Sequence, residues 1–175
     1  MGLKLEYFYN GITHLVTLGI RANHYRIWGN EISDDSYCES ELRNKCHGVR
    51  WQYENKTIEL YEEGVKIIAY PSPDYRYIIV IYGYGSKLFP RPDNCVVYNL
   101  DGSIHKRISA PLLFKPYGKN KRGEYFYTVG WAKKGDEIVV ELWVSDGGLY
   151  REWVEMIEFN PGTGEFGDLL LRSCL

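Results

Sequence analysis

The sequence predicts one all-β domain over residues 1–175, or a mainly β domain with one short helix, built as an antiparallel sandwich or open barrel. Composition is the first reason: the chain has 18 glycines, 16 tyrosines, 6 phenylalanines and 5 tryptophans, and aromatic residues favour strands. The second reason is a series of short apolar runs separated by turn residues. The third is a period-two alternation of apolar and polar residues inside those runs, which is typical of a strand with one buried face.

Eleven runs carry the predicted strands, and turn residues separate them at intervals of roughly ten to fifteen positions. The runs are Leu3–Tyr9, His14–Gly19, Tyr25–Trp28, Val49–Tyr53, Thr57–Tyr61, Val65–Tyr70, Arg76–Tyr82, Cys95–Asn99, Tyr125–Trp131, Glu137–Val144 and Tyr150–Phe159. Alternation is clearest in the tenth run, where one face is entirely aliphatic: Ile138, Val140, Leu142 and Val144. Two longer connections, 83–93 and 111–124, are predicted to be loops, and long loops in compact β domains often carry binding residues.

One short helix is predicted between the third and fourth strands. Ser36 with Glu39 three positions later is a capping-box pattern, and Gly48 is placed to end the helix. On such a helix three apolar side chains would form one stripe: Cys38, Leu42 and Cys46.

Two stretches of the chain align at a spacing of 60 to 61 residues. The first begins at Ser72-Pro73-Asp74 and ends at Asn99-Leu100-Asp101-Gly102, and the second runs from Ala132 to Gly162. Each contains a turn, an apolar strand, an excursion, a second apolar strand and a turn with glycine. Over about residues 70–167 this pattern resembles the blade repeat of β-propellers. The resemblance implies an alternative fold, a partial or irregular propeller-like array of hairpins, because closure takes about four blades and this length supplies about three.

Charge is distributed unevenly along the chain, although the net charge is only −2. From Tyr84 to Arg122 there are eight basic and two acidic residues, a surplus of six positive charges. From Gly123 to Leu175 there are four basic and ten acidic residues, a surplus of six negative charges. Folding can mix such segments into one surface, or it can leave opposed patches that steer a charged partner.

Motifs for catalysis and for metal or cofactor binding are absent from the sequence. There is no nucleophile elbow, no H-E-x-x-H and no complete phosphate loop. The four cysteines lack the paired spacing of a zinc site, so we expect reduced, half-buried thiols, no metal and no cofactor. No apolar run is long enough to span a bilayer, and no secretory leader is recognisable at the N-terminus, so we expect a cytoplasmic protein.

The expected function is binding to another protein, without enzymatic activity. Small size, many aromatic residues, uneven charge and the lack of motifs resemble the general character of bacterial toxin-immunity proteins, which implies a partner toxin encoded next to this protein. Three groups are candidate contact residues: an acidic group, Glu31, Asp34, Asp35, Glu39 and Glu41; a first loop group, Tyr84, Lys87, Phe89 and Arg91; and a second loop group, Tyr117, Lys119, Lys121 and Arg122. The acidic group would suit a cationic toxin site and the loops an acidic partner.

Two other function classes stay open. Aromatic residues among the lysines and arginines of segment 84–122 would suit nucleic acid, but the sequence pI of about 6.1 and the acidic C-terminal third argue against it. An enzyme with its site in a β-sheet cleft is the third class, and no residue pattern points to it.

Overall fold

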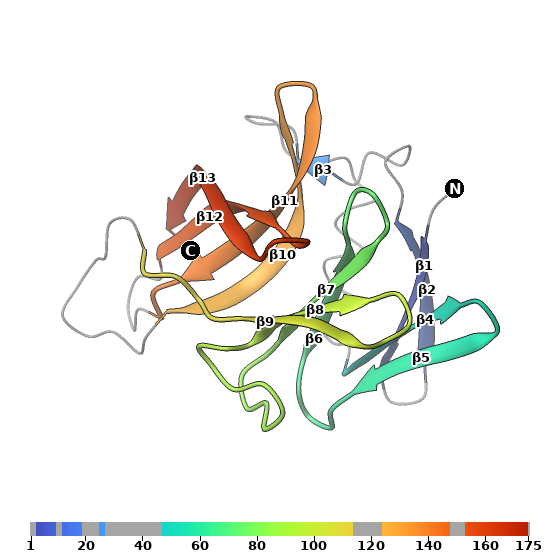
Figure 1. The fold of residues 1–175 in the computed structure, drawn as a ribbon. Helices are drawn as coiled ribbons and strands as arrows, with labels where there is room; N and C mark the ends of the chain where they lie inside the picture. The colour runs from blue at the N-terminus through green and yellow to red at the C-terminus, as the bar shows by residue number, and fades with distance from the viewer. Residues whose placement is uncertain are drawn as a thin grey trace.

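The computed structural model describes residues 3–9, 12–18, 25–26, 47–113, 124–147 and 153–174. Within those ranges every helix or strand is a β-strand, which confirms the all-β prediction, and the strands form three sheets and no closed barrel. Figure 1 shows the three sheets side by side from the N-terminal to the C-terminal part of the chain. The helix predicted over residues 36–47 falls almost wholly outside the described ranges.

The first sheet contains four antiparallel strands in the order β2-β1-β4-β5. They are β1 (Leu3–Tyr9), β2 (Ile12–Leu18), β4 (Gly48–Tyr53) and β5 (Lys56–Tyr61). Strand β5 alternates between exposed and half-buried residues, as its period-two pattern predicts.

The second sheet is a four-stranded meander whose spatial order is the chain order, β6-β7-β8-β9. Its strands are β6 (Ile67–Pro71), β7 (Tyr77–Tyr82), β8 (Cys95–Asn99) and β9 (Ile104–Ile108). All of β6 and nearly all of β7 and β8 are buried, which explains why these runs are continuously apolar rather than alternating.

The third sheet repeats that meander. It contains β10 (Tyr125–Lys134), β11 (Glu137–Ser145), β12 (Trp153–Asn160) and β13 (Glu165–Cys174), again in chain order. A two-residue strand, β3 (Tyr25–Arg26), pairs in parallel with β10 on the other side. The register shifts within β10–β11 and β12–β13 mark bulges or irregularities in the pairing.

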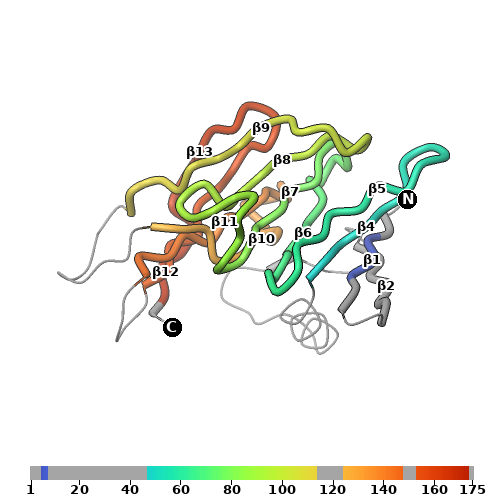
Figure 2. The backbone as a smooth tube through the Cα atoms, turned by 90° about the horizontal axis from the view of Figure 1, so that it is seen from below, coloured from blue at the N-terminus to red at the C-terminus, as the bar shows by residue number. Residues whose placement is uncertain are grey.

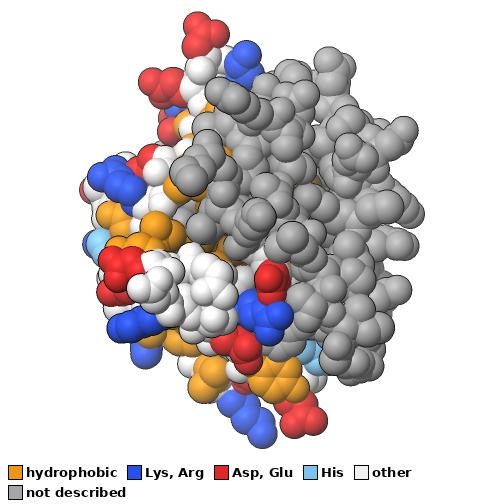
Figure 3. All heavy atoms as spheres, turned by 90° about the vertical axis from the view of Figure 1, so that its right-hand side faces the viewer, with side chains coloured by type: hydrophobic (Ala, Val, Ile, Leu, Met, Phe, Trp, Pro, Cys, Tyr) orange, Lys and Arg blue, Asp and Glu red, His pale blue; other side chains and the backbone are white. Residues whose placement is uncertain are grey.

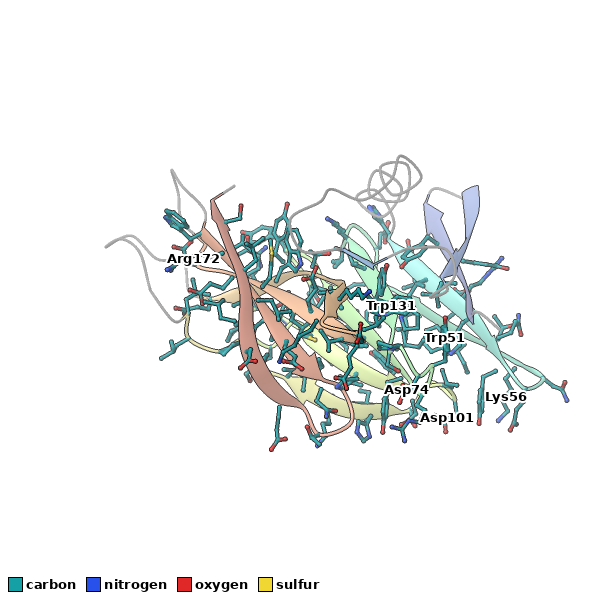
Figure 4. All side chains as sticks on the ribbon, turned by 90° about the horizontal axis from the view of Figure 1, so that it is seen from above. Trp51, Lys56, Asp74, Asp101, Trp131 and Arg172 are labelled. Atoms are coloured by element: carbon teal, nitrogen blue, oxygen red, sulfur yellow. The ribbon has the colours of Figure 1, made fainter. Side chains whose placement is uncertain are left out.

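The core lies where the sheets meet. Strand β4 contacts β6, and β10 contacts both β6 and β7. Trp131 of β10 is 1% exposed, donates its indole N–H to the carbonyl of Pro71 at 2.7 Å and packs edge-on against Tyr70 and Tyr75. Figure 4 shows Trp131 between the second and third sheets, with Arg172 far from it at one end of the molecule and Lys56 at the other. One indole therefore joins two sheets by both packing and a hydrogen bond.

The two aligned stretches of sequence occupy the same positions in the second and third sheets. The first begins at the turn before β7, the second begins in the last residues of β10 just before the turn to β11, and each ends at the turn after the third strand of its sheet. The third strands end at Asn99 and Asn160, and a glycine with positive φ follows in each turn, Gly102 at +84° and Gly164 at +77°. Their amides donate to Asn99 O at 3.0 Å and Asn160 O at 2.7 Å. The spacing in the sequence therefore corresponds to a repeated supersecondary unit.

These two turns also touch the preceding sheet. In the second sheet, Leu100 accepts a 2.8 Å hydrogen bond from the indole of Trp51, and Gly102 lies against Ile58. In the third sheet, Gly162 O lies 3.0 Å from Nε2 of His105. Figure 2 shows β9 running alongside the β12–β13 hairpin, consistent with this contact. The sheets are therefore joined by their turns as well as by their core strands.

All eleven predicted strands are present in the described residues, two of them, Leu3–Tyr9 and Cys95–Asn99, with the predicted ends and the others with shifted ends, and two further strands were not predicted. These are β9 and β13, the outermost strands of the second and third sheets. Each lies at a sheet edge, where a strand needs fewer apolar residues because one side faces solvent.

Candidate binding site

Only one of the three predicted contact groups lies in the described part of the chain. The acidic group at positions 31, 34, 35, 39 and 41 and the second loop group at positions 117, 119, 121 and 122 fall outside it. Tyr84, Lys87, Phe89 and Arg91 all lie on the connection between β7 and β8, residues 83–94, called here the β7–β8 loop. In Figure 1 this loop projects below the sheets.

The first half of the β7–β8 loop is held by Glu62, which follows β5. Its carboxylate accepts a hydrogen bond from the Ser86 hydroxyl at 2.7 Å and another from the Lys87 amide at 2.6 Å. Ser86 Oγ in turn accepts from the Phe89 amide at 3.0 Å, and the Gly83 amide donates to Lys66 O at 2.7 Å. These bonds fix the loop backbone and engage Glu62, leaving the Lys87 side chain exposed.

The second half of the loop is held by Asn94, whose side chain is 1% exposed and spans two sheets. Its Nδ2 donates to Tyr82 O and to Phe126 O, both at 2.8 Å, and its Oδ1 accepts from the Phe126 amide at 3.0 Å. The amide side chain thus pairs with the Phe126 backbone as a neighbouring strand would. Because Tyr125 precedes Phe126, this pairing fixes the start of β10 beside the loop.

Arg91 lies against that start. Its guanidinium carbon is 3.2 Å from the centre of the Tyr125 ring and 5.4 Å from the centre of the Tyr84 ring. Tyr125 is 6% exposed and Tyr84 is 79% exposed, so one ring belongs to the core and the other to the surface. Arg91 Nε is buried and has no hydrogen-bond partner, and no described residue forms an ion pair with this guanidinium.

Phe89 supports the loop from beneath rather than contributing to its surface. The side chain is 9% exposed and its ring centre lies 4.6 Å from that of Tyr82. The guanidinium of Arg107, on β9, lies 5.1 Å from the centre of the Phe89 ring. Burial first, and then the hydrogen bond that Tyr82 shares with Tyr98, raises the pKa of the Tyr82 phenol far above its usual value. Beneath the loop, Tyr82 is therefore uncharged.

The arginines whose side chains the structure describes fall into two groups. Three form ion pairs with carboxylates: Arg50 with Glu6 at 2.5 Å, Arg76 with Asp74 at 2.5 Å, and Arg172 with Glu155 at 3.1 Å. Arg91 and Arg107 lie over aromatic rings, as Arg76 and Arg172 also do, but within the described ranges neither Arg91 nor Arg107 has a carboxylate partner. The two arginines without a carboxylate partner therefore both lie at the β7–β8 loop.

The exposed surface of the loop is both aromatic and basic. Tyr84 and Leu88, at 79% and 59% exposure, stand beside the exposed Lys87. The four candidate residues of the first loop group thus lie on one loop, and one of them, Phe89, has a buried side chain. The sequence analysis did not single out Tyr125, Asn94 or Glu62 as supporting residues, nor Arg107, which lies in the basic segment 84–122.

On the face shown in Figure 3, the basic and acidic side chains of the described residues interleave with apolar ones. Within the described ranges, no three His, Cys, Asp or Glu side chains are grouped to hold a metal ion. The described residues also include no helix with the length and hydropathy to cross a membrane.

Comparison of the chain with protein-family models, with curated proteins and with solved structures found no match.

Proposed function

We propose that this protein acts by binding another protein, and that the β7–β8 loop is a contact surface for an acidic partner. The observation that carries the proposal is the pair of arginines, Arg91 and Arg107, that lie on aromatic rings at this loop without a carboxylate partner. The other arginines whose side chains the structure describes, Arg50, Arg76 and Arg172, each have one. Leaving two cations unpaired at one place gives a surface that an acidic partner would neutralise.

The composition of the loop surface fits a protein interface. Tyrosine and arginine are the residue types most enriched among those that contribute most to binding energy, and Tyr84 and Arg91 lie side by side. The hydrogen bonds that the Glu62 carboxylate accepts and those that the Asn94 amide donates hold the loop in place before any partner arrives. A loop ordered in advance loses little conformational entropy on binding, which favours affinity.

The more specific proposal is a bacterial immunity protein that neutralises a cognate toxin by covering its active site. Small size, the lack of catalytic motifs and a surface of aromatic and charged residues support this role. The basic β7–β8 loop is the contact surface for this role among the described residues, and the acidic group at positions 31, 34, 35, 39 and 41, predicted from the sequence alone, lies outside them.

Co-expression tests this proposal. The protein encoded beside this chain is expressed in a bacterial host with and without the chain, and survival is counted. We expect protection by the wild type, reduced protection by R91Q/R107Q, and full protection by R76Q, which removes an arginine that is ion-paired to Asp74. Toxicity unchanged by the wild-type chain, with no binding between the two purified proteins, would refute the immunity role.

Nucleic-acid binding is the second candidate, because an exposed tyrosine beside an unpaired arginine also suits a base next to a phosphate. Titration of single-stranded RNA and DNA at several salt concentrations separates the two. Affinity that falls steeply and linearly on a log–log plot against salt would favour nucleic acid. No binding at low salt would remove that candidate.

A further inference from the structure

We infer that Arg91 is the anchor of the proposed interface and that it receives the carboxylate of an Asp or Glu side chain in an acidic segment of the partner. This inference rests on the proposed protein-binding function and names the chemistry at its centre. The ligand is an acidic peptide segment, and the receiving group is the edge of the Arg91 guanidinium.

The stacking of Arg91 leaves its donors available. A guanidinium that lies on a ring uses its flat face, whereas its five N–H groups point outward in its own plane. The Arg91 carbon is 3.2 Å from the Tyr125 ring centre, so that face is occupied. None of the donors has an acceptor among the described residues, and Nε is buried as well. Nε is closed off from solvent, so a partner carboxylate would meet the two Nη groups, which are not among the buried atoms without a partner.

Two acids that lie at the loop are already engaged in hydrogen bonds. Glu62 accepts from Ser86 and from the Lys87 amide. Asp93, two residues from Arg91, accepts from the Ser109 hydroxyl. The loop therefore keeps its own carboxylates in structural hydrogen bonds, and the Arg91 guanidinium remains available for an external one.

A carboxylate is the group that fits best. Its two oxygens match two parallel N–H donors of a guanidinium, and the pair is stronger where water is excluded. Tyr84, 5.4 Å from the guanidinium carbon and 79% exposed, is placed to shield such a pair from solvent once a partner covers it. Lys87 is exposed on the same loop, and the Arg107 guanidinium lies over the Phe89 ring beneath it. Further acidic residues of the partner segment would therefore find positive charge nearby.

The inference is tested on the full chain by NMR of the arginine Nε–H groups, with hexaglutamate as the probe and hexaglutamine as its neutral match. We expect a saturable shift of the Arg91 Nε–H signal with hexaglutamate, no shift with hexaglutamine, and little movement of the Arg76 signal. R91K should weaken hexaglutamate binding about tenfold, because ammonium cannot form the paired bonds, whereas R76K should not change it. Circular dichroism of both variants confirms that they are folded.

Three results would overturn the inference: no shift at Arg91, an equal shift at Arg76, or equal binding by R91K. Inorganic phosphate serves as a second probe, and a stronger response to phosphate than to hexaglutamate would also overturn the assignment to an acidic peptide. Failure here is distinct from failure of the proposed function, because co-expression scores protection whichever residue makes the contact. If R91K still protects and the Arg91 Nε–H signal does not shift, the role of Arg91 as anchor is refuted while the proposed immunity function stands.

Discussion

The second and third sheets are built on the same four-stranded meander, yet they use their cations differently. On the third sheet Lys134 contacts Glu158 at 2.6 Å and Asp168 at 2.7 Å, and Arg172 contacts Glu155 at 3.1 Å, so three strands are joined by charge pairs. At the β7–β8 loop of the second sheet, Arg91 and Arg107 lie on rings instead. The repeated unit thus supplies the scaffold, and the connection between its second and third strands carries the surface proposed for binding.

This difference separates stability from recognition. Exposed ion pairs such as those of Lys134 contribute little free energy of unfolding individually, but they neutralise the surface on which they lie. Arginines on rings keep their charge available for a partner. We therefore expect substitutions between the sheets to change stability, and substitutions of Arg91 and Arg107 to change binding while leaving the fold largely intact.

The largest effect is expected where the second and third sheets are joined. W131A removes a buried indole that packs on Tyr70 and donates to Pro71 O, so we expect the free energy of unfolding to fall by about 3–5 kcal/mol. W131F keeps a ring but leaves the Pro71 carbonyl unpaired, at a cost of about 1–3 kcal/mol. Urea unfolding measures both. A loss below 1 kcal/mol for W131A would mean that the sheets are not joined through this residue.

Asn94 gives the next effect, because it joins the β7–β8 loop to the third sheet. N94D cannot donate to Tyr82 O or Phe126 O and places a charge in a buried position, so we expect a loss of about 2–4 kcal/mol. N99A is the matched control, since Asn99 donates to Ser103 in an exposed turn and should cost under 1 kcal/mol. Equal losses would show that the Asn94 bridge adds nothing to an ordinary turn.

The glycine turns test whether the sheets also depend on each other through their turns. An alanine at Gly102 would place its Cβ 2.7 Å from Ile58 Cγ2 at a φ of +84°, so G102A combines backbone strain with a clash against the first sheet. G135A has the strain, at φ +60°, with no atom within 4 Å. We expect about 1–2 kcal/mol for G135A and a larger loss for G102A, measured by thermal and urea unfolding. Equal losses would indicate that Ile58 moves aside freely.

The smallest expected effect is on the stability of the fold at acidic pH. Burial alone would raise the pKa of Asp74, but hydrogen bonds from Ser72 and Arg76 outweigh it and hold the pKa below its usual value. A lowered folded-state pKa stabilises the fold above the unfolded-state value of about 3.9, and this contribution is lost as pH falls through the folded-state pKa. D74N should therefore show a flatter decline in stability below about pH 4 than the wild type. The difference should be under 1 kcal/mol because the pair is exposed, and parallel acid curves would contradict it.

Most of the fold could be predicted from the sequence because buried strands carry dense apolar signals. The run Tyr77–Tyr82 is apolar throughout, and a segment with buried residues on both faces must be so. Strand β9, with the sequence Ile-His-Lys-Arg-Ile, has only two aliphatic residues, and it is a strand because β8 offers it an edge to pair with. Strand β13 contains Gly167 and Asp168, which are poor strand residues in isolation. Both depend on tertiary pairing, which local sequence does not encode.

The site could be predicted only in part. Three surface residues of the β7–β8 loop share a stretch of basic and aromatic sequence, so composition alone brings Tyr84, Lys87 and Arg91 together. Nothing local links Arg91 to Tyr125, 34 positions away, because that contact arises from the Asn94 bridge to the start of β10. Likewise, Glu62 reaches the loop from across a turn between two sheets. Contacts of that range come from topology rather than from pattern.

The buried thiol of Cys95 can report how often the strands of the second sheet separate. The thiol is fully buried at the start of β8, directly after the loop that carries the proposed anchor, and burial raises its pKa above the usual range. Thiolate is the species that alkylating reagents attack, so the side chain should stay unmodified until β7 and β8 separate. The rate of alkylation of Cys95, followed by peptide mass spectrometry, would therefore report how often β7 and β8 separate. Slower alkylation in the presence of a partner would show that binding at the β7–β8 loop reduces this separation.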